Sequence, residues 1–473
     1  MELSNELSKN IEKLHEIFPI EKSYDLITRT LYIGNTKAYW IGINGLCDND
    51  ILQHIFSDLQ NPMYTQDADI EDLSIFMASK IGYIQAELCG DWDKLIKNIL
   101  SGPSVLFVDG FSQAVILDTR KYPIRSIEEP DVEKVSRGAK DGFVETIVYN
   151  TALIRRRIRN PKLSFEMLTV GTEAKSDVAI AYIDGGIDTK LLENIKEKIN
   201  QLNVPALTMG PQSLQELIVK KRWWNPLPQT RYTQRPDVAC SYILEGYIAV
   251  IVDNFPSVMI FPCTLFQFTQ NPEDYYQNPS VGNYLRILRF FCMLASLLVM
   301  PVFLLLGIYA KYLPSYLQVI RTEAVSPTKL FIYVLIIEIF LDILKYSSAN
   351  ASNGLSNSIG LVGGLIISDV AIKLKWATTE VLFYAATTML ATVSISSQEF
   401  AQALRLYRYL LVIMTGLFHL PGFIIGCILI LISIATTPSI SGKSYLWPLY
   451  PFHWKALKTI LFRYPTAKYQ AKR

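Results

Sequence analysis

The pattern of apolar and polar positions divides the chain into two parts that meet near residue 281. Residues 290–310 carry no charge and are bracketed by Arg286, Arg289 and Lys311. A helix of this length measures about 31 Å, enough to cross a hydrocarbon core of ~30 Å. Residues 409–436 form a second charge-free run, which is longer than one crossing needs and has room to tilt or to bend at Pro421-Gly422. We predict a membrane-spanning helix in each run.

Three weaker apolar segments lie between these runs. Residues 330–344 are interrupted by Glu338 and Asp342, residues 359–372 are rich in small side chains, and residues 381–397 are charge-free but carry several Thr and Ser. Each segment is short for a lone crossing and carries polarity that lipid penalises, so we expect it to pack against protein or to line a wet cavity. The small side chains that allow close helix packing are Gly360, Gly363 and Gly364.

Basic residues flank the apolar part and predict its orientation. Residues 443–473 contain seven Lys and Arg and no acid, and Arg286 and Arg289 precede the first predicted span. Basic flanks favour the cytoplasm, so both ends should lie there and the number of crossings should be even. Four crossings follow if residues 330–344 are re-entrant or interfacial.

In the first 280 residues, short apolar runs alternate with polar turns, as they do in soluble proteins. Residues 104–110 (SVLFVDG) predict a buried strand that pairs with residues 114–118 as a hairpin, and residues 190–202 predict an amphipathic helix. About 280 residues exceed the usual domain size of roughly 100–150, so two subdomains are expected. The predicted fold is an α/β or α+β soluble N-terminal region of two subdomains, followed by a polytopic α-helical membrane domain. The boundaries are residues 1–125, 126–281, 282–442 with four to five hydrophobic segments, and 443–473 as a basic cytoplasmic tail.

Composition and charge support this division. The chain is 50% hydrophobic and only 19% charged, with a mean hydropathy of +0.22, whereas soluble domains contain ~25% charged residues. Residues 1–280 hold 28 Lys and Arg against 37 Asp and Glu, a net charge of −9, while residues 281–473 hold 17 against 6, a net charge of +11. These values exclude a disordered chain and a nucleic-acid partner bound through bulk positive charge. The N-terminus lacks a basic stretch followed by an apolar one, so no signal peptide is expected.

No pattern of residues predicts catalysis. The six cysteines are scattered without a C-x-x-C pair, and the four histidines are too dispersed for a metal site. Neither a dinucleotide fingerprint nor a Walker A, nucleophile-elbow or metalloprotease pattern is present. We therefore expect no enzyme activity, no metal and no cofactor.

A basic cluster stands out in the acidic region, in the sequence ALIRRRIRNPKL. An arginine cluster can bind phosphate, a lipid headgroup or an acidic neighbour. We favour a solvated helix face that pairs with Asp141 and Glu145, or an inter-subunit contact. The members are Arg155, Arg156, Arg157 and Arg159.

The ionisable residues within the apolar part are the candidate ion-path residues. Glu338 and Asp342 lie four residues apart on one helical face, and Lys345 can pair with Asp342. In a ring of identical subunits this face would form a belt of carboxylates that concentrates cations. The alternative is a helix lying at the membrane surface with its acids in water. Asp369 is either a further ion-path residue or a partner of Lys373 at the membrane edge.

Several long blocks of sequence resemble one known family. They include VSRGAKDGFVETIVYNTALIRRRIRNPKL (residues 135–163), RPDVACSYILEGYIAVIVDNFPSVMIFPCTLFQF (235–268), NPEDYY (271–276) and LIIEIFLDILKY (335–346). Over roughly residues 105–447 the chain resembles the A-subunit family of bacterial spore germinant receptors. The family's members usually have small or amide residues in place of Ser368-Asp369, a departure that argues against direct nutrient sensing.

The resemblance implies a multi-pass protein of the spore inner membrane with a cytoplasmic N-terminal region. It also implies oligomers and a role in ion release early in germination, with membrane lipid, germinant-receptor proteins and an accessory membrane subunit as partners. Two functions follow. The first is an oligomeric ion-conducting or ion-gating subunit that promotes germination. The second is a non-conducting scaffold or signal-relay subunit that supports the receptors.

Overall fold

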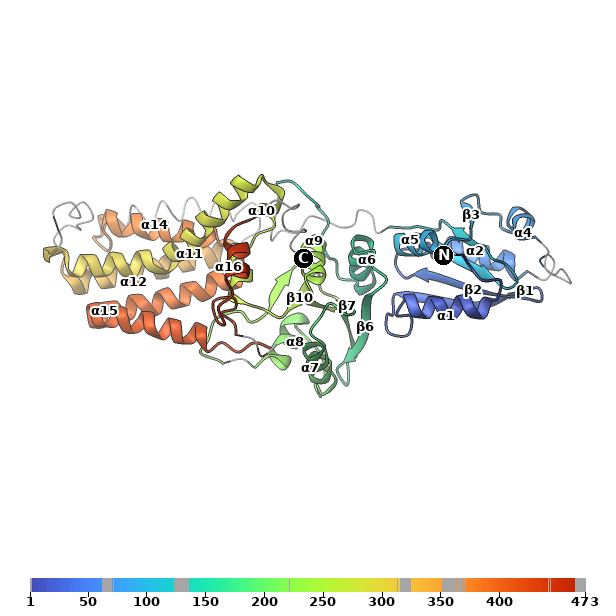
Figure 1. Cartoon of the computed structure of the whole chain (residues 1–473). Coiled ribbons are helices and arrows are strands. Elements are labelled where there is room, and N and C mark those ends of the chain that lie inside the picture. Colours follow the sequence, from blue (N-terminus) through green and yellow to red (C-terminus); the bar gives the residue numbers. More distant parts are fainter. Residues whose placement is uncertain are drawn as a thin grey trace. The chain divides into compact units, whose positions relative to one another are not determined.

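The computed structural model divides into two compact units, which we describe separately (Figure 1). Unit 1 comprises Met1–Lys220 and Thr230–Cys263, and unit 2 comprises Lys221–Gln229 and Thr264–Arg473. The structure describes residues 2–61, 70, 72–122, 136–220, 222–312, 314, 325–350, 364, 369, 371–440, 442 and 444–463.

The first half of unit 1 is a five-stranded antiparallel sheet with helices on both faces. The strand order is β1-β2-β4-β5-β3. Neighbouring residues on β2 point to opposite faces, so Ile41 joins the core under α1 and α5 while Trp40 joins the core under α2 and α4. The elements are α1 (Leu7–Ile17), β1 (Leu26–Ile33), β2 (Thr36–Ile43), α2 (Asn49–Leu59), α4 (Leu73–Lys80), β3 (Ala86–Cys89), α5 (Trp92–Ser101), β4 (Ser104–Val108) and β5 (Ala114–Leu117).

The second half of unit 1 repeats the first, element by element. Its strand order, β6-β7-β9-β10-β8, is the same when each strand is matched in chain order. The elements are α6 (Ile147–Arg157), β6 (Leu163–Val170), β7 (Ser176–Ile183), α7 (Thr189–Asn200), α8 (Pro211–Ile218), β8 (Arg231–Thr233), α9 (Pro236–Leu244), β9 (Ile248–Val252) and β10 (Val258–Phe261).

The repeat extends to individual hydrogen bonds. Asp109, which follows β4, accepts a hydrogen bond from the backbone N–H at the start of α1, and Asp253, which follows β9, does the same for α6; both N···O distances are 3.0 Å. A buried asparagine in each of these helices, Asn10 or Asn150, bonds both backbone groups of a residue six positions earlier. Unit 1 is therefore a duplicated α/β module.

Unit 2 is helical apart from its connecting segments. Two helices, α11 and α15, are long and apolar enough to cross a membrane in the part of the chain that the structure describes. A sheet-containing N-terminal region followed by a region of apolar helices confirms the predicted fold class. The elements are η1 (Leu265–Thr269), α10 (Glu273–Tyr276), α11 (Pro279–Ile308), η2 (Ala310–Tyr312), α12 (Pro327–Asn350), α14 (Thr379–Val393), α15 (Gln398–Ala435) and α16 (Trp454–Leu461).

Helix α15 reverses direction within its length. His419 has the non-helical angles φ 55° and ψ −134°, and two antiparallel arms, residues 398–418 and 420–435, meet there (Figure 1). The Tyr407 hydroxyl lies 2.6 Å from Ser433 Oγ, although a straight helix would separate the two residues by roughly 39 Å. Gly422 permits the turn, because a Cβ there would lie 1.9 Å from the Met414 carbonyl oxygen. The sequence suggested a tilt or bend at Pro421-Gly422; the structure has a hairpin.

Helix α12 is one continuous helix of 24 residues, longer than the apolar segment recognised at residues 330–344. At 1.5 Å per residue it is about 36 Å long. Leu330, Val334 and Ile337 on this helix are almost fully buried in a core shared with α11, α14 and the first arm of α15. The first half of the helix therefore packs within the bundle, whereas the described residues after Glu338 are partly or fully exposed.

Candidate functional site

The candidate site is a pair of ion pairs between α12 and the first arm of α15. Glu338 Oε2 lies 2.8 Å from Arg408 Nη2, and the two side chains are 3% and 4% exposed. Arg408 Nη1 also donates to the Ser296 carbonyl oxygen of α11 at 2.7 Å. Arg408 Nη1 also lies 3.3 Å from Thr392 Oγ1 of α14, so this side chain connects α11, α12 and α14 to α15.

The second ion pair lies one helical turn along α12. Asp342 Oδ1 lies 2.9 Å from Arg405 Nη1, and the Tyr409 hydroxyl donates to Asp342 Oδ2 at 2.9 Å. This pair is less buried, since the Asp342 and Arg405 side chains are 30% and 11% exposed. Asp342 thus makes its described contacts with α15, whereas the sequence suggested Lys345 as its partner.

The two pairs set the register of α12 against α15. Residue numbers rise along one helix as they fall along the other, so the first arm of α15 runs antiparallel to α12. A shift of one turn, about 5.4 Å, would bring Asp342 to Arg408 and leave Glu338 beside Leu411 and Val412. An unpaired charge at membrane depth costs ~2.5–3.5 kcal/mol on insertion scales. The two ion pairs, which we call the ion-pair ladder, therefore favour one register of α12 against α15 strongly over the neighbouring registers.

The buried pair does not use all of its hydrogen-bonding capacity. Glu338 Oε1 and Arg408 Nε are both buried and have no hydrogen-bond partner among the described residues, and the same holds for Arg405 Nε. A side-on arrangement with two parallel bonds would have satisfied both atoms of the Glu338–Arg408 pair. The pair is thus held through one contact and retains polar atoms that a rearrangement or a water molecule can satisfy.

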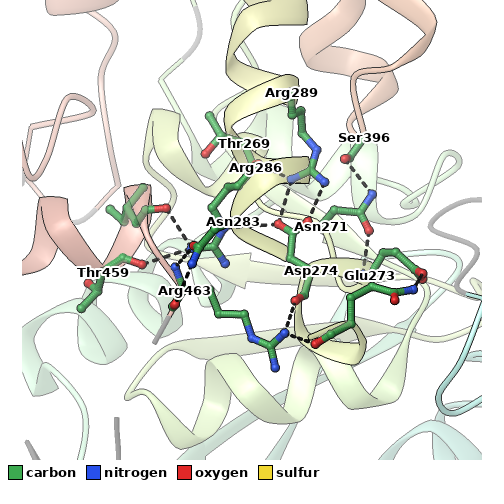
Figure 2. A network of polar contacts seen from close by, with 12 residues as sticks. Thr269, Asn271, Glu273, Asp274, Asn283, Arg286, Arg289, Ser396, Thr459 and Arg463 are labelled. Atoms are coloured by element: carbon green, nitrogen blue, oxygen red, sulfur yellow. Dashed lines mark hydrogen bonds and ion pairs between the residues drawn. The ribbon is translucent and has the colours of Figure 1, made fainter. Parts of the chain in front are cut away.

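A second charge network surrounds Asp274, just before α11 (Figure 2). The Asp274 side chain is fully buried and lies between Arg289, which donates to both carboxylate oxygens at 2.8 and 2.9 Å, and Arg286, whose Nε lies at 3.3 Å. Arg463, which follows α16, donates to the backbone carbonyls of Asp274 and Tyr275 at 2.7 and 2.9 Å. Arg286 and Arg289 were counted as basic flanks of the first span. Both arginines pair with Asp274 of α10, and Arg286 also donates to backbone carbonyls of α16.

The basic cluster of unit 1 is divided among different environments. Arg155 is fully buried, and its guanidinium contacts both carboxylate oxygens of Asp25 at 2.7 and 3.1 Å, joining the two halves of unit 1. Arg157 pairs with Asp141 at 2.6 Å, as the sequence suggested. Arg156 lies over the Tyr122 ring and is exposed, as is Arg159. The solvated helix face expected from the sequence is therefore wrong for Arg155.

The comparisons with known proteins identify the family. The family model described as Bacillus/Clostridium GerA spore germination protein matches residues 12–473. The chain belongs to this GerA family. The predicted resemblance to germinant-receptor A subunits is confirmed.

Relatives of this GerA-family chain align over most of its length. Stage V sporulation protein AF of Bacillus subtilis is 37% identical over 98% of this chain and 93% of its own length. Spore germination protein KA of the same organism is 28% identical over 98% of this chain and 85% of its own. One similar solved structure is the N-terminal domain of the A subunit of the Bacillus megaterium spore germinant receptor GerK3. Its sequence is 26% identical to this chain, the alignment covers 55% of this chain and 96% of that domain, and the TM-score is 0.43.

The remaining candidate residues of the GerA-family chain lie away from the ion pairs. Asp369 pairs with Lys373, and both side chains are largely exposed, so the described contact matches one of the two alternatives left open by the sequence. Gly364 is a helical residue, and Gly360 and Gly363 lie outside the described residues. Lys345 is half-buried. Within the described ranges, no group of three His, Cys, Asp or Glu side chains could hold a metal ion.

Sequence reasoning missed the two arginines that complete the site. Arg405 and Arg408 precede the charge-free run at residues 409–436, so the sequence placed them outside the predicted span. The signal that could have found them is their spacing. Two arginines three residues apart on one helix match two acids four residues apart on another, which is the spacing of an antiparallel ladder.

Proposed function

We propose that this GerA-family chain is a multi-pass protein of the spore inner membrane that promotes germination as an oligomeric ion-gating or ion-conducting subunit. The names of the relatives support the role in spore germination, and the two apolar helices support membrane association. The N-terminal region is cytoplasmic in this proposal, and the chain acts without catalysis or a cofactor. Its partners are membrane lipid, further copies of the chain, germinant-receptor proteins and an accessory membrane subunit.

The observation that carries the gating proposal is the ladder of ion pairs between α12 and α15. Ionisable residues inside a membrane protein are costly and commonly mark ion pathways or switches. Here the acids are neutralised by Arg405 and Arg408, so they do not form a belt of free carboxylates in this conformation. The ladder acts as a latch on a non-conducting state, and its release would free both carboxylates and let α12 move.

The hairpin in α15 supports the proposed orientation. Ser396, just before α15, bonds Asn271, just before α11, at 2.9 Å, so the first arm begins at the end of the bundle where α11 begins. Arg405 and Arg408 then lie nearer to that end, which the positive-inside preference assigns to the cytoplasm. If residues 398–435 were a single crossing that ended in the cytoplasm, both arginines would lie on the outer side, against this preference.

The test is ion flux through vesicles that contain the full chain. We expect Arg408→Gln and Glu338→Gln to increase potassium efflux over the unaltered chain, because each removes the latch, and the paired variant Glu338→Met with Arg408→Met to restore a tight register without charge. Arg159→Gln, exposed and far along the chain in unit 1, is the control. Sizing of the detergent-solubilised chain checks the oligomer.

A non-conducting scaffold or signal-relay subunit is the second candidate, and the neutralisation of Glu338 and Asp342 by two arginines favours it. A correctly inserted oligomer that shows no efflux in any variant would support this candidate and contradict the gating proposal. Efflux that is high in the unaltered chain and unchanged in the variants would keep conduction but remove the latch.

A further inference from the structure

Residues 222–224 form an exposed turn that carries aromatic and basic side chains. The Trp223 side chain is 94% exposed and the Trp224 side chain 47%, and the Arg222 guanidinium lies 5.6 Å from the centre of the Trp224 ring. Lys220 and Lys221 precede this turn in the sequence. A tryptophan with almost its whole surface in water is unfavourable in a soluble protein, since it offers more apolar area than most side chains.

The turn is fixed to the end of α15 by the residue that follows it. Asn225 is 5% exposed; its Nδ2 donates to Thr437 Oγ1 at 2.8 Å, and its Oδ1 accepts from the Tyr407 hydroxyl at 3.3 Å. Thr437 lies two residues beyond the last residue of α15. Because α15 is one of the two helices of membrane-spanning character, residues 222–224 lie at the level where that helix leaves the apolar layer.

The C-terminal segment meets the same end of the bundle. The Tyr445 hydroxyl donates to the Pro228 carbonyl oxygen at 2.8 Å. Helix α16, nine residues further on, buries Leu457 and Ile460 against Phe266 while Trp454 stays 60% exposed and Lys455 and Lys458 face outward. Both surface segments therefore present aromatic and basic side chains together.

We propose that the Arg222–Trp224 turn is a lipid anchor that docks on the anionic headgroup region of the membrane at the end of α15. Tryptophan is enriched at membrane–water interfaces because its ring is apolar and its N–H is polar, and adjacent cationic side chains are attracted to anionic lipid. The positive charge of Arg222 and its neighbours, and the connection through Asn225 to the end of the apolar helix α15, favour lipid over a second protein. The inference rests on α15 being in the membrane and not on ion conduction.

The experiment uses the full chain in nanodiscs of phosphatidylcholine and phosphatidylglycerol whose acyl chains are brominated just below the headgroups. Subtracting the emission of Trp223→Phe from that of the unaltered chain isolates Trp223. We expect this difference emission to be quenched and shifted to shorter wavelength in brominated lipid, and the quenching to weaken in Arg222→Gln or when phosphatidylglycerol is omitted.

Two controls separate failure of the anchor from failure of insertion. Trp376, 49% exposed in unit 2, is isolated in the same way and reports insertion of the bundle, while Trp92, 2% exposed in unit 1, should not be quenched. Unquenched Trp223 beside quenched Trp376 would overturn the proposal. If that unquenched emission is nevertheless short in wavelength, the Trp223 ring is buried against another copy of the chain and not in lipid. Quenching that does not depend on Arg222 or on phosphatidylglycerol would contradict the choice of anionic headgroups.

Discussion

The Glu338–Arg408 pair allows a quantitative test of the proposed latch. Changing Arg408 to Met leaves the Glu338 carboxylate buried at 3% exposure with no partner of opposite charge among the described residues. Breaking a buried pair from one side costs about 3–5 kcal/mol, whereas replacing both partners by apolar residues of similar volume is commonly neutral or stabilising. We therefore expect Arg408→Met to destabilise unit 2 by about 3–5 kcal/mol and the double change Glu338→Met, Arg408→Met to recover most of that loss.

The second pair provides the matched comparison. Asp342 is 30% exposed, so solvent screens its interaction with Arg405, and the corresponding change Arg405→Met should cost closer to the ~1 kcal/mol of exposed pairs. The assay is thermal unfolding of the full chain in one detergent, followed by the loss of the oligomer or monomer peak on size exclusion. For a unit of this size, 1 kcal/mol corresponds to roughly 2–4 °C.

The outcome that would refute the reasoning is specific. If the two single variants at 338 and 408 and their double variant shift the midpoint additively, the side chains have no coupling energy and the pair is not formed. Equal losses for Arg405→Met and Arg408→Met would show that burial does not set the magnitude. Either result would also remove the physical basis of the latch.

Three further predictions concern other parts of the chain. Asp25→Asn should destabilise unit 1 by about 3–5 kcal/mol because it leaves Arg155 buried and unpaired, while Arg159→Ala, on the exposed part of the same cluster, should stay within about 0.5 kcal/mol in the same denaturation assay. Arg463→Ala should expose the segment after residue 444 to limited proteolysis without loss of α11, because the hydrogen bonds of this arginine to the carbonyl oxygens of Asp274, Tyr275 and Gln277 are lost. An unchanged digestion pattern would contradict the assigned role. Burial raises the pKa of Cys240 to about 12 from the 9.0 of a free thiol. The folded chain therefore keeps a proton that the unfolded chain loses, and this contribution to the stability of the fold falls as the pH rises from about 9 towards 12. Alkylation read by peptide mass spectrometry at pH 8 should label Cys240 only after unfolding.

The broad division of the fold was predictable from sequence because it depends on long-range averages of polarity. All but the last two residues of the charge-free run at 290–310 lie within α11, and the strands expected at residues 104–110 and 114–118 are β4 and β5. The duplication in unit 1 was missed, although a signal exists. VLFVDGFSQAVIL at residues 105–117 and AVIVDNFPSVMIF at 249–261 share the pattern of strand, aspartate, turn and strand.

The hairpin in α15 and the ion-pair ladder were not predictable in the same way. Hydropathy counts apolar residues along a line and does not detect that the backbone reverses at His419, so 28 charge-free residues suggested one long span. Glu338 and Asp342 were recognised as unusual because an acid in an apolar helix is costly on its own. Their partners lie about 70 residues away, and pairing at that distance depends on how the helices pack.

The segment at residues 221–229 has a consequence for how this chain can be dissected. Unit 2 takes these nine residues from the middle of unit 1, so the backbone passes between the units three times, at residues 220–221, 229–230 and 263–264. A fragment that begins at residue 264 lacks Asn225, which bonds both arms of the α15 region, and Leu227, which is buried. A fragment that ends at residue 263 carries the same apolar residues without the helices that cover them. A helical fragment that begins at residue 264 is therefore incomplete, and a permuted or co-expressed design must return residues 221–229 to it.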